Sequence, residues 1–135
     1  MAIEILVASF DGTEGDRIQQ IRYSVFSQEQ KIDAAIDLDG QDPCAVHVLA
    51  KIDEAFAGTG RMLKDGHIGR LAVLKSFRGK GVGEKLVETL LDIARGKEMR
   101  RVFLGAQEHA AGFYRELGFM EYGSPYVEAG IRHVH

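Results

Sequence analysis

A glycine-rich turn near the middle of the chain constrains the fold more than any other feature. Residues 67–74 form an apolar segment that predicts a strand. The sequence Arg-Gly-Lys-Gly-Val-Gly follows at residues 78–83, and apolar residues then recur at helical spacing up to Gly96. A strand that passes through such a turn into a helix presents unpaired backbone N–H groups and the positive end of the helix dipole. The turn therefore predicts an anion site, to which Arg78 and Lys80 add positive charge.

The spacing within this turn excludes two common phosphate-binding loops. A Walker loop needs Ser or Thr after its Gly-Lys pair, but Lys80 is followed by Gly81. A dinucleotide-binding loop needs a third glycine at position 84 or 86, and these positions hold Glu84 and Leu86. The sequence thus argues against a binder of nucleoside triphosphates or of dinucleotides.

Hydrophobic periodicity outside the turn predicts a mixture of strands and helices. The predicted strands cover residues 2–8, 44–51, 55–63, 67–74, 101–106, 119–122 and 131–135, and the predicted helices cover residues 14–27, 82–96 and 109–117. The order is β-α-β-β-β-α-β-α-β-β. Short hairpins and one long helical crossover together predict an α/β (α+β) fold on a single mixed sheet, with helices on both faces.

Composition limits the classes of protein to which the chain can belong. With 135 residues, 45% hydrophobic and 27% charged, we expect one globular domain over residues 1–135. A net charge of −3 argues against nucleic-acid binding, which relies on cationic surface. Cys44 is the only cysteine, so no disulfide can form within the chain. No apolar run approaches the ~20 residues of a membrane span, and the start of the sequence lacks signal-peptide features. We therefore expect no membrane contact and a cytoplasmic location.

Three sequence blocks resemble the GNAT superfamily of N-acetyltransferases. The pattern Arg-x-x-Gly-x-Gly at residues 78–83 resembles the turn that holds the pyrophosphate of acetyl-CoA in that family. Residues 111–119, Ala-Gly-Phe-Tyr-Arg-Glu-Leu-Gly-Phe, are similar to its A-x-x-F-Y-x-x-x-G-F block. Residues 22–30, Arg-Tyr-Ser-Val-Phe-Ser-Gln-Glu-Gln, are similar to a compact bacterial subgroup. The predicted element order agrees with the GNAT fold along nearly the whole chain.

The resemblance implies an acetyl-CoA-dependent N-acetyltransferase, in which a primary amine of a small molecule or protein attacks the thioester directly. Tyr114 corresponds to the tyrosine that many relatives use as the general acid for the departing thiolate. The Leu71 N–H is the expected donor to the thioester carbonyl. The expected coenzyme contacts are Leu71, Ala72, Val73, Arg78, Gly79, Lys80, Gly81, Val82 and Gly83.

The sequence offers several candidates for the general base and for the acceptor pocket. His67 lies eleven residues before Arg78, where some histone-modifying relatives carry a glutamate base, and an imidazole suits proton relay near neutral pH. His47, His133 and Glu29 are rivals for this role, and a water chain without a single base is a further alternative. The residues expected to contact the substrate are Arg22, Glu29, His47 and His133.

Two other groups of polar residues receive plain structural interpretations. The acidic stretch of Asp33, Asp37, Asp39 and Asp42 could receive a cationic amine, but a solvated loop is the favoured interpretation. His133 and His135 share one face of a predicted strand, yet no carboxylate or cysteine cluster completes a metal site. We therefore expect no metal.

A non-catalytic module that binds or senses acyl-CoA is the main alternative function, because it would need the same pyrophosphate turn. Tyr114 and a usable base favour the enzyme. Two copies of the chain could pair through an exposed edge strand into a homodimer.

Overall fold

The computed structural model describes residues 3–31, 40–99, 102–104, 106–107, 111–117, 119, 126–128 and 131–134. The chain folds as two compact units, Met1–Val102 and Phe103–His135. The extent of one domain over residues 1–135 stays a prediction. Among the described residues, no helix has both the length and the apolar character that crossing a membrane would require.

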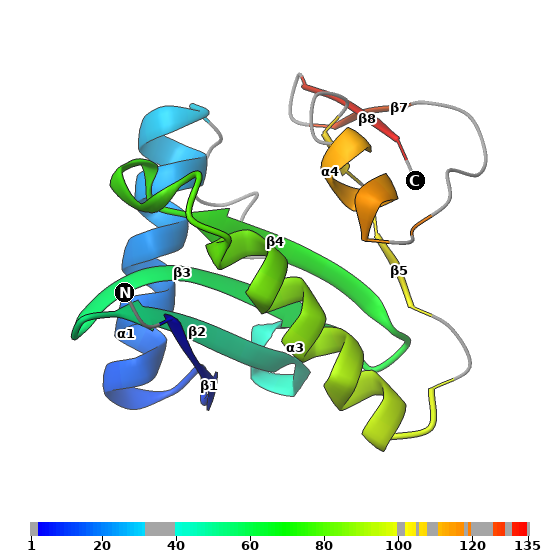
Figure 1. Cartoon of the computed structure of the whole chain (residues 1–135), viewed down its shortest axis with the longest axis horizontal. Coiled ribbons are helices and arrows are strands. Elements are labelled where there is room, and N and C mark those ends of the chain that lie inside the picture. Colours follow the sequence, from blue (N-terminus) through cyan, green and yellow to red (C-terminus); the bar gives the residue numbers. More distant parts are fainter. Residues whose placement is uncertain are drawn as a thin grey trace. The chain divides into compact units, whose positions relative to one another are not determined.

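An antiparallel sheet forms the centre of the first unit (Figure 1). Its strands β1 (Ile3–Ala8), β2 (Val46–Ile52), β3 (Ala55–Met62) and β4 (His67–Val73) follow one another in chain order. Asp53 and Glu54 both adopt positive φ between β2 and β3, which is the conformation of a type I′ hairpin turn. The predicted hairpin is therefore confirmed.

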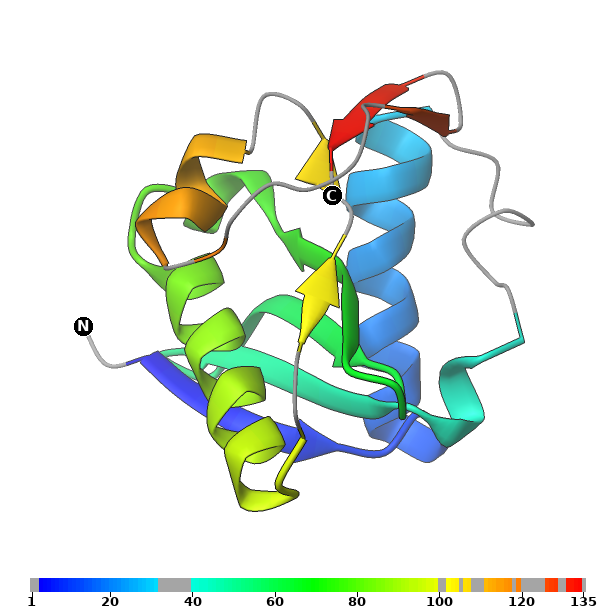
Figure 2. The same cartoon turned by 90° about the vertical axis from the view of Figure 1, so that its right-hand side faces the viewer.

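Helices α1 (Gly12–Arg22) and α3 (Val82–Gly96) cover opposite faces of this sheet (Figure 2). On the α1 face, Ile18 and Ile21 pack with Leu49 of β2 in one buried cluster. On the α3 face, the apolar side of the helix is buried at 3.6-residue spacing, through Val82, Leu86, Val87, Leu90 and Ala94. The sequence prediction of helices on both faces is confirmed for this unit.

Two glycines of β3 allow α3 to approach the sheet closely. A Cβ atom at Gly58 would lie 2.9 Å from the carbonyl oxygen of Ala72 and 3.1 Å from Cδ1 of Leu86. A Cβ atom at Gly60 would lie 3.0 Å from Cδ1 of Leu71. Gly58 therefore needs glycine for space, because a Cβ atom there would lie against the backbone of β4. At Gly60 the methyl end of the Leu71 side chain would have to move by a few tenths of an ångström.

The first helical segment differs from the predicted α-helix over residues 14–27. The α-helix ends at Arg22, and the chain continues as a π-helix, η1 (Tyr23–Glu29), in which the Gln30 N–H donates to the Val25 carbonyl at 3.0 Å. Short 3₁₀ helices follow at η2 (Asp42–Cys44) and η3 (Lys75–Phe77). The periodicity detected a helix here but could not show its change of winding.

The second unit contains short elements only. These are β5 (Phe103–Leu104), β6 (Ala106–Gln107), α4 (Ala111–Glu116), β7 (Tyr126–Glu128) and β8 (Ile131–Val134). Strand β8 pairs antiparallel with both β6 and β7. Of the predicted strand over residues 119–122, Phe119 is outside any strand and the rest lies outside the described residues. The mixed α and β class is confirmed, but two short strands, β5 and β6, stand where one strand over residues 101–106 was predicted, and β7 was not predicted.

Candidate functional site

The glycine-rich turn between β4 and α3 is open to solvent. Gly79 and Gly81 have φ angles of 77° and 84°, a region that residues with side chains rarely adopt. A Cβ atom at either position would meet nothing within 4 Å, so the requirement for glycine is conformational and the space beside the turn is empty. Gly81 is the N-cap of α3 and no side chain caps it, so the first N–H groups of the helix are not engaged by a capping side chain.

The predicted turn residues differ in whether the side chain or only the backbone can contact a ligand. Lys80 is exposed, whereas the Val82 side chain is buried near Gly58. Val82 and Gly83 therefore can reach a ligand through their N–H groups alone. This arrangement suits a phosphate, because backbone donors at a helix N-terminus bind anions without help from side chains.

A β-bulge distorts β4 just before the turn. Gly69 pairs with Arg61 and Ala72 pairs with Thr59, so two residues of β4, Arg70 and Leu71, face one residue of β3. Arg70 adopts a φ of 48°, which marks the bulge as locally strained. A bulge interrupts the regular hydrogen-bond ladder and re-aims the groups around it. The structure thus breaks the regular ladder at Leu71, the residue whose N–H is the expected carbonyl donor.

Arg78, the first residue of the turn, is held by a bidentate ion pair. Its Nη1 and Nη2 atoms each donate to a carboxylate oxygen of Glu29 at 2.6 Å, and its Nε donates to the Val73 carbonyl at 2.9 Å. The protein therefore fixes the guanidinium of Arg78 through three hydrogen bonds. The hydrogen bonds from Arg78 lower the pKa of Glu29, which makes Glu29 a poor general base at neutral pH.

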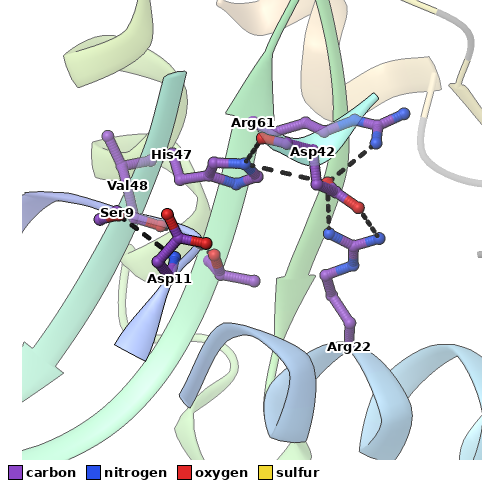
Figure 3. A network of polar contacts seen from close by, with 8 residues as sticks. Ser9, Asp11, Arg22, Asp42, His47, Val48 and Arg61 are labelled. Carbon is purple, nitrogen blue, oxygen red and sulfur yellow. Dashed lines mark hydrogen bonds and ion pairs between the residues drawn. The ribbon is translucent and has the colours of Figure 1, made fainter. Parts of the chain in front are cut away.

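A second ion-pair network is buried on the α1 side of the sheet (Figure 3). Arg22 donates to both carboxylate oxygens of Asp42, at 2.7 and 3.2 Å, and Arg61 donates to one of them at 3.0 Å. Burial raises the pKa of Asp42, but the two guanidinium groups outweigh that effect and leave its pKa lowered. Asp42 is therefore a buried carboxylate that ties α1 to β3, and for this residue the predicted solvated loop is wrong. Asp33, Asp37 and Asp39 lie outside the described residues.

His47 belongs to the same network and is also buried. Its Nε2 atom lies 2.9 Å from the Asp42 carbonyl, which can only accept, so Nε2 carries the proton. Its ring stacks on Phe10 with centroids 5.1 Å apart, and burial lowers its pKa. His47 and Arg22 were expected to contact the substrate. Because their side chains are buried against Asp42, we assign them to the support of the fold instead.

Arg61 was not singled out from the sequence, although a signal was present. It stands inside β3, between glycine and methionine in an otherwise uncharged strand. A charge in a buried strand needs a partner of opposite sign, so its position pointed to a distant carboxylate.

His67 lies at the start of β4, at the end of the strand remote from the turn. Its N–H donates to the Asp65 carboxylate at 3.0 Å and its carbonyl accepts from Leu63 at 2.9 Å. Leu71 follows His67 by four positions, which is at most about 13 Å along the backbone. A base role for His67 thus requires an acceptor amine bound between the two.

Tyr114 lies on α4 in the second unit, packed between two aromatic rings. Phe113 and Phe119 contact it edge-on, with centroids 5.0 and 5.9 Å away. Burial raises the pKa of Tyr114 to about 12, so its phenol is protonated at neutral pH.

His133 lies in β8 at the register position opposite Gln107 and Tyr126. Across the described ranges, no three His, Cys, Asp or Glu residues gather closely enough to hold a metal ion, and His135 lies outside those ranges.

The sequence matches the family described as an acetyltransferase (GNAT) domain over residues 14–135. It is 34% identical over 122 residues to YyaT, an uncharacterized Bacillus subtilis protein, covering 85% of this chain and 82% of YyaT. It is also 33% identical over 124 residues to ElaA of Escherichia coli, covering 85% of this chain and 80% of ElaA.

Solved structures agree with this assignment over nearly the full chain. The crystal structure of Escherichia coli ElaA matches with a TM-score of 0.87 at 28% identity, and covers 98% of this chain and 97% of its own. An acyl-CoA N-acyltransferase from Pseudomonas aeruginosa matches with a TM-score of 0.86 at 29% identity and the same coverage. This chain therefore belongs to the GNAT acetyltransferase family.

Proposed function

We propose that this protein is an acetyl-CoA-dependent N-acetyltransferase that acts on a primary amine of a small molecule or peptide. The observation that carries the proposal is the open turn at residues 78–83, where two positive-φ glycines lead into an uncapped helix N-terminus. Family membership supports the same chemistry, because acetyl transfer is the reaction for which the family is named. The thioester of acetyl-CoA would supply the activated acetyl group.

The proposed coenzyme contacts are mostly backbone groups. The N–H groups of Gly79, Lys80, Gly81, Val82 and Gly83 bind the diphosphate, and the exposed Lys80 ammonium adds charge. The strand end at Leu71, Ala72 and Val73 pairs with the pantetheine amides. Backbone groups of this kind are fixed before the ligand arrives, so binding costs little conformational entropy.

Three tasks remain for the transfer itself. The Leu71 N–H, re-aimed by the bulge in β4, donates to the carbonyl oxygen as negative charge builds there. Tyr114 donates its phenolic proton to the departing thiolate, and a pKa of about 12 keeps that proton in place until it is needed. The amine loses a proton to His67 or to a chain of waters.

The test pairs a binding measurement with a turnover measurement. Wild-type protein should melt at higher temperature in saturating CoA, and a panel of primary amines should release free thiol from acetyl-CoA. Tyr114→Phe should lower kcat at least about tenfold and leave the CoA affinity nearly unchanged, because general acid catalysis contributes about 10²–10⁴-fold. Tyr23→Phe, at an exposed tyrosine of η1, is the matched control and should retain the wild-type rate.

Three outcomes would each contradict a different part of the proposal. A wild-type protein whose melting temperature does not respond to CoA would refute the coenzyme site. A thermal response without thiol release from any amine would favour the non-catalytic binding module. An unaltered kcat in Tyr114→Phe would remove Tyr114 from the mechanism.

A further inference from the structure

The sequence block at residues 22–30 is anchored at both of its ends by ion pairs to distant segments. Arg22 at one end pairs with Asp42, and Glu29 at the other end pairs with Arg78 of the turn, 49 residues further along. Val25 between them is buried in the core. This block therefore carries two separate attachments, one to the interior and one to the coenzyme turn.

The π-helical winding of η1 is consistent with these two attachments. In an α-helix, seven residues make almost two complete turns, so Arg22 and Glu29 would project from one face. Their partners lie on different segments, the η2 helix and the turn after β4. The wider winding over Tyr23–Glu29 rotates Glu29 away from the face of Arg22, which allows both pairs to form.

The Glu29 carboxylate holds Arg78 against the end of β4. Three N–H donors of Arg78 are engaged: two by Glu29 at 2.6 Å each, and Nε by the Val73 carbonyl at 2.9 Å. A bidentate pair fixes the plane of the guanidinium, which a single contact does not. Because Arg78 is the first residue of the turn and Val73 the last of β4, this side chain bridges the two ends of the segment before the glycines.

Packing alone does not hold the turn in place. Gly79 and Gly81 have open space where a side chain would be, and the residues from Arg78 to Gly81 are exposed. On the helix side, the buried Val82 side chain fixes the chain. On the strand side, the corresponding anchor is the side chain of Arg78 with Glu29.

We propose that Glu29 is a positioning residue for the coenzyme: through Arg78 it fixes the shape of the diphosphate-binding turn before the ligand binds. The inference rests on the proposed function of that turn. If Glu29 merely competed with the diphosphate for Arg78, or repelled the diphosphate, removal of the carboxylate would strengthen CoA binding. If Glu29 positions the turn, its removal weakens CoA binding.

The experiment is a measurement of CoA affinity by titration calorimetry for Glu29→Gln, which keeps the shape of the side chain and removes its charge. We expect the Kd for CoA to rise about tenfold, the equivalent of about 1.4 kcal/mol. The KM for acetyl-CoA should rise similarly, while kcat at saturating acetyl-CoA falls less than about twofold. Glu88→Gln, at an exposed carboxylate of α3, is the matched control for loss of one negative charge and should bind CoA like wild type.

A second pair of variants tests whether Glu29 acts through Arg78. In an Arg78→Ala background, Glu29→Gln should have no further effect on the Kd, because the group that Glu29 positions is gone. Arg78→Lys keeps the charge but cannot form the bidentate pair, so it should weaken CoA binding about as much as Glu29→Gln.

The possible results are distinct from those of the proposed function. If wild-type protein fails to bind CoA, the proposed function falls. If wild type binds CoA and Glu29→Gln binds equally well or more tightly, the positioning role is refuted and the function stands. Equal effects of Glu29→Gln in the wild-type and Arg78→Ala backgrounds would also refute it.

Discussion

The buried carboxylate of Asp42 gives the sharpest test of how this fold is held together. Asp42 accepts hydrogen bonds from Arg22 and Arg61, and its side chain is 3% exposed. Asp42→Asn keeps the shape and one acceptor oxygen, but it leaves two buried guanidinium groups without this negative charge. Loss of one partner from a buried ion pair costs about 3–5 kcal/mol of unfolding free energy. For a chain of 135 residues, that range corresponds to a fall in Tm of about 10–18 °C.

The measurement is urea denaturation followed by circular dichroism, with a thermal melt as a second measure. Asp92→Asn is the matched control, because Asp92 pairs with Arg95 at 2.8 Å, close to the 2.7 Å of the buried pair, while its side chain is 75% exposed. An exposed pair contributes about 0–1 kcal/mol, so the control should melt within a few degrees of wild type. Similar small losses in both variants would refute the conclusion that burial makes the Asp42 pairs decisive.

Two further predictions concern the same unit. His47 is faced by Asp42, Arg22 and Arg61, and burial holds its pKa below 6.5 in the folded state. The unfolded chain therefore binds more protons below pH 6.5, so the contribution of His47 to stability is complete above that pH and is lost as the pH falls below it. His47→Gln should flatten the pH dependence of the unfolding free energy between pH 7.5 and 5.5, and an unchanged slope would contradict the burial of a neutral imidazole. Gly58→Ala should cost about 1–3 kcal/mol, because its Cβ would lie 2.9 Å from the Ala72 carbonyl. Gly69→Ala, where a Cβ meets nothing within 4 Å, should cost nothing, and equal losses in these two variants would contradict the steric origin of the cost at Gly58.

Local patterns predicted most of the fold because each main element satisfies its own rule. Helix α3 has a clear apolar face and a glycine turn before it, and the β2–β3 hairpin has short strands on both sides. The winding of η1 could not be predicted, because the change from α to π brings Glu29 to Arg78, a residue 49 positions away. A pairing at that distance leaves no trace in the local periodicity.

The candidate site was predictable where the backbone carries it. The turn and the helix after it were predicted from the sequence, and Gly79 and Gly81 adopt the positive φ that glycine permits. The charged side chains were harder to place, since their roles depend on partners from other elements. Arg22 and His47 are polar residues of types that often bind substrates, yet both are buried against Asp42. Their residue types suggested contact with the substrate, whereas their burial indicates that they support the fold.

The two ion pairs of the 22–30 block should be separable by experiment, because burial divides their roles. The Arg22–Asp42 pair is almost fully buried, so its loss should lower stability first. The Glu29–Arg78 pair has both side chains 39% exposed, and solvent limits its contribution to stability to about 1 kcal/mol or less. At a temperature where both variants are folded, Asp42→Asn should therefore bind CoA normally, while Glu29→Gln should bind it weakly and melt close to wild type. In this helical block, Arg22 would then stabilise the core and Glu29 would position the coenzyme turn.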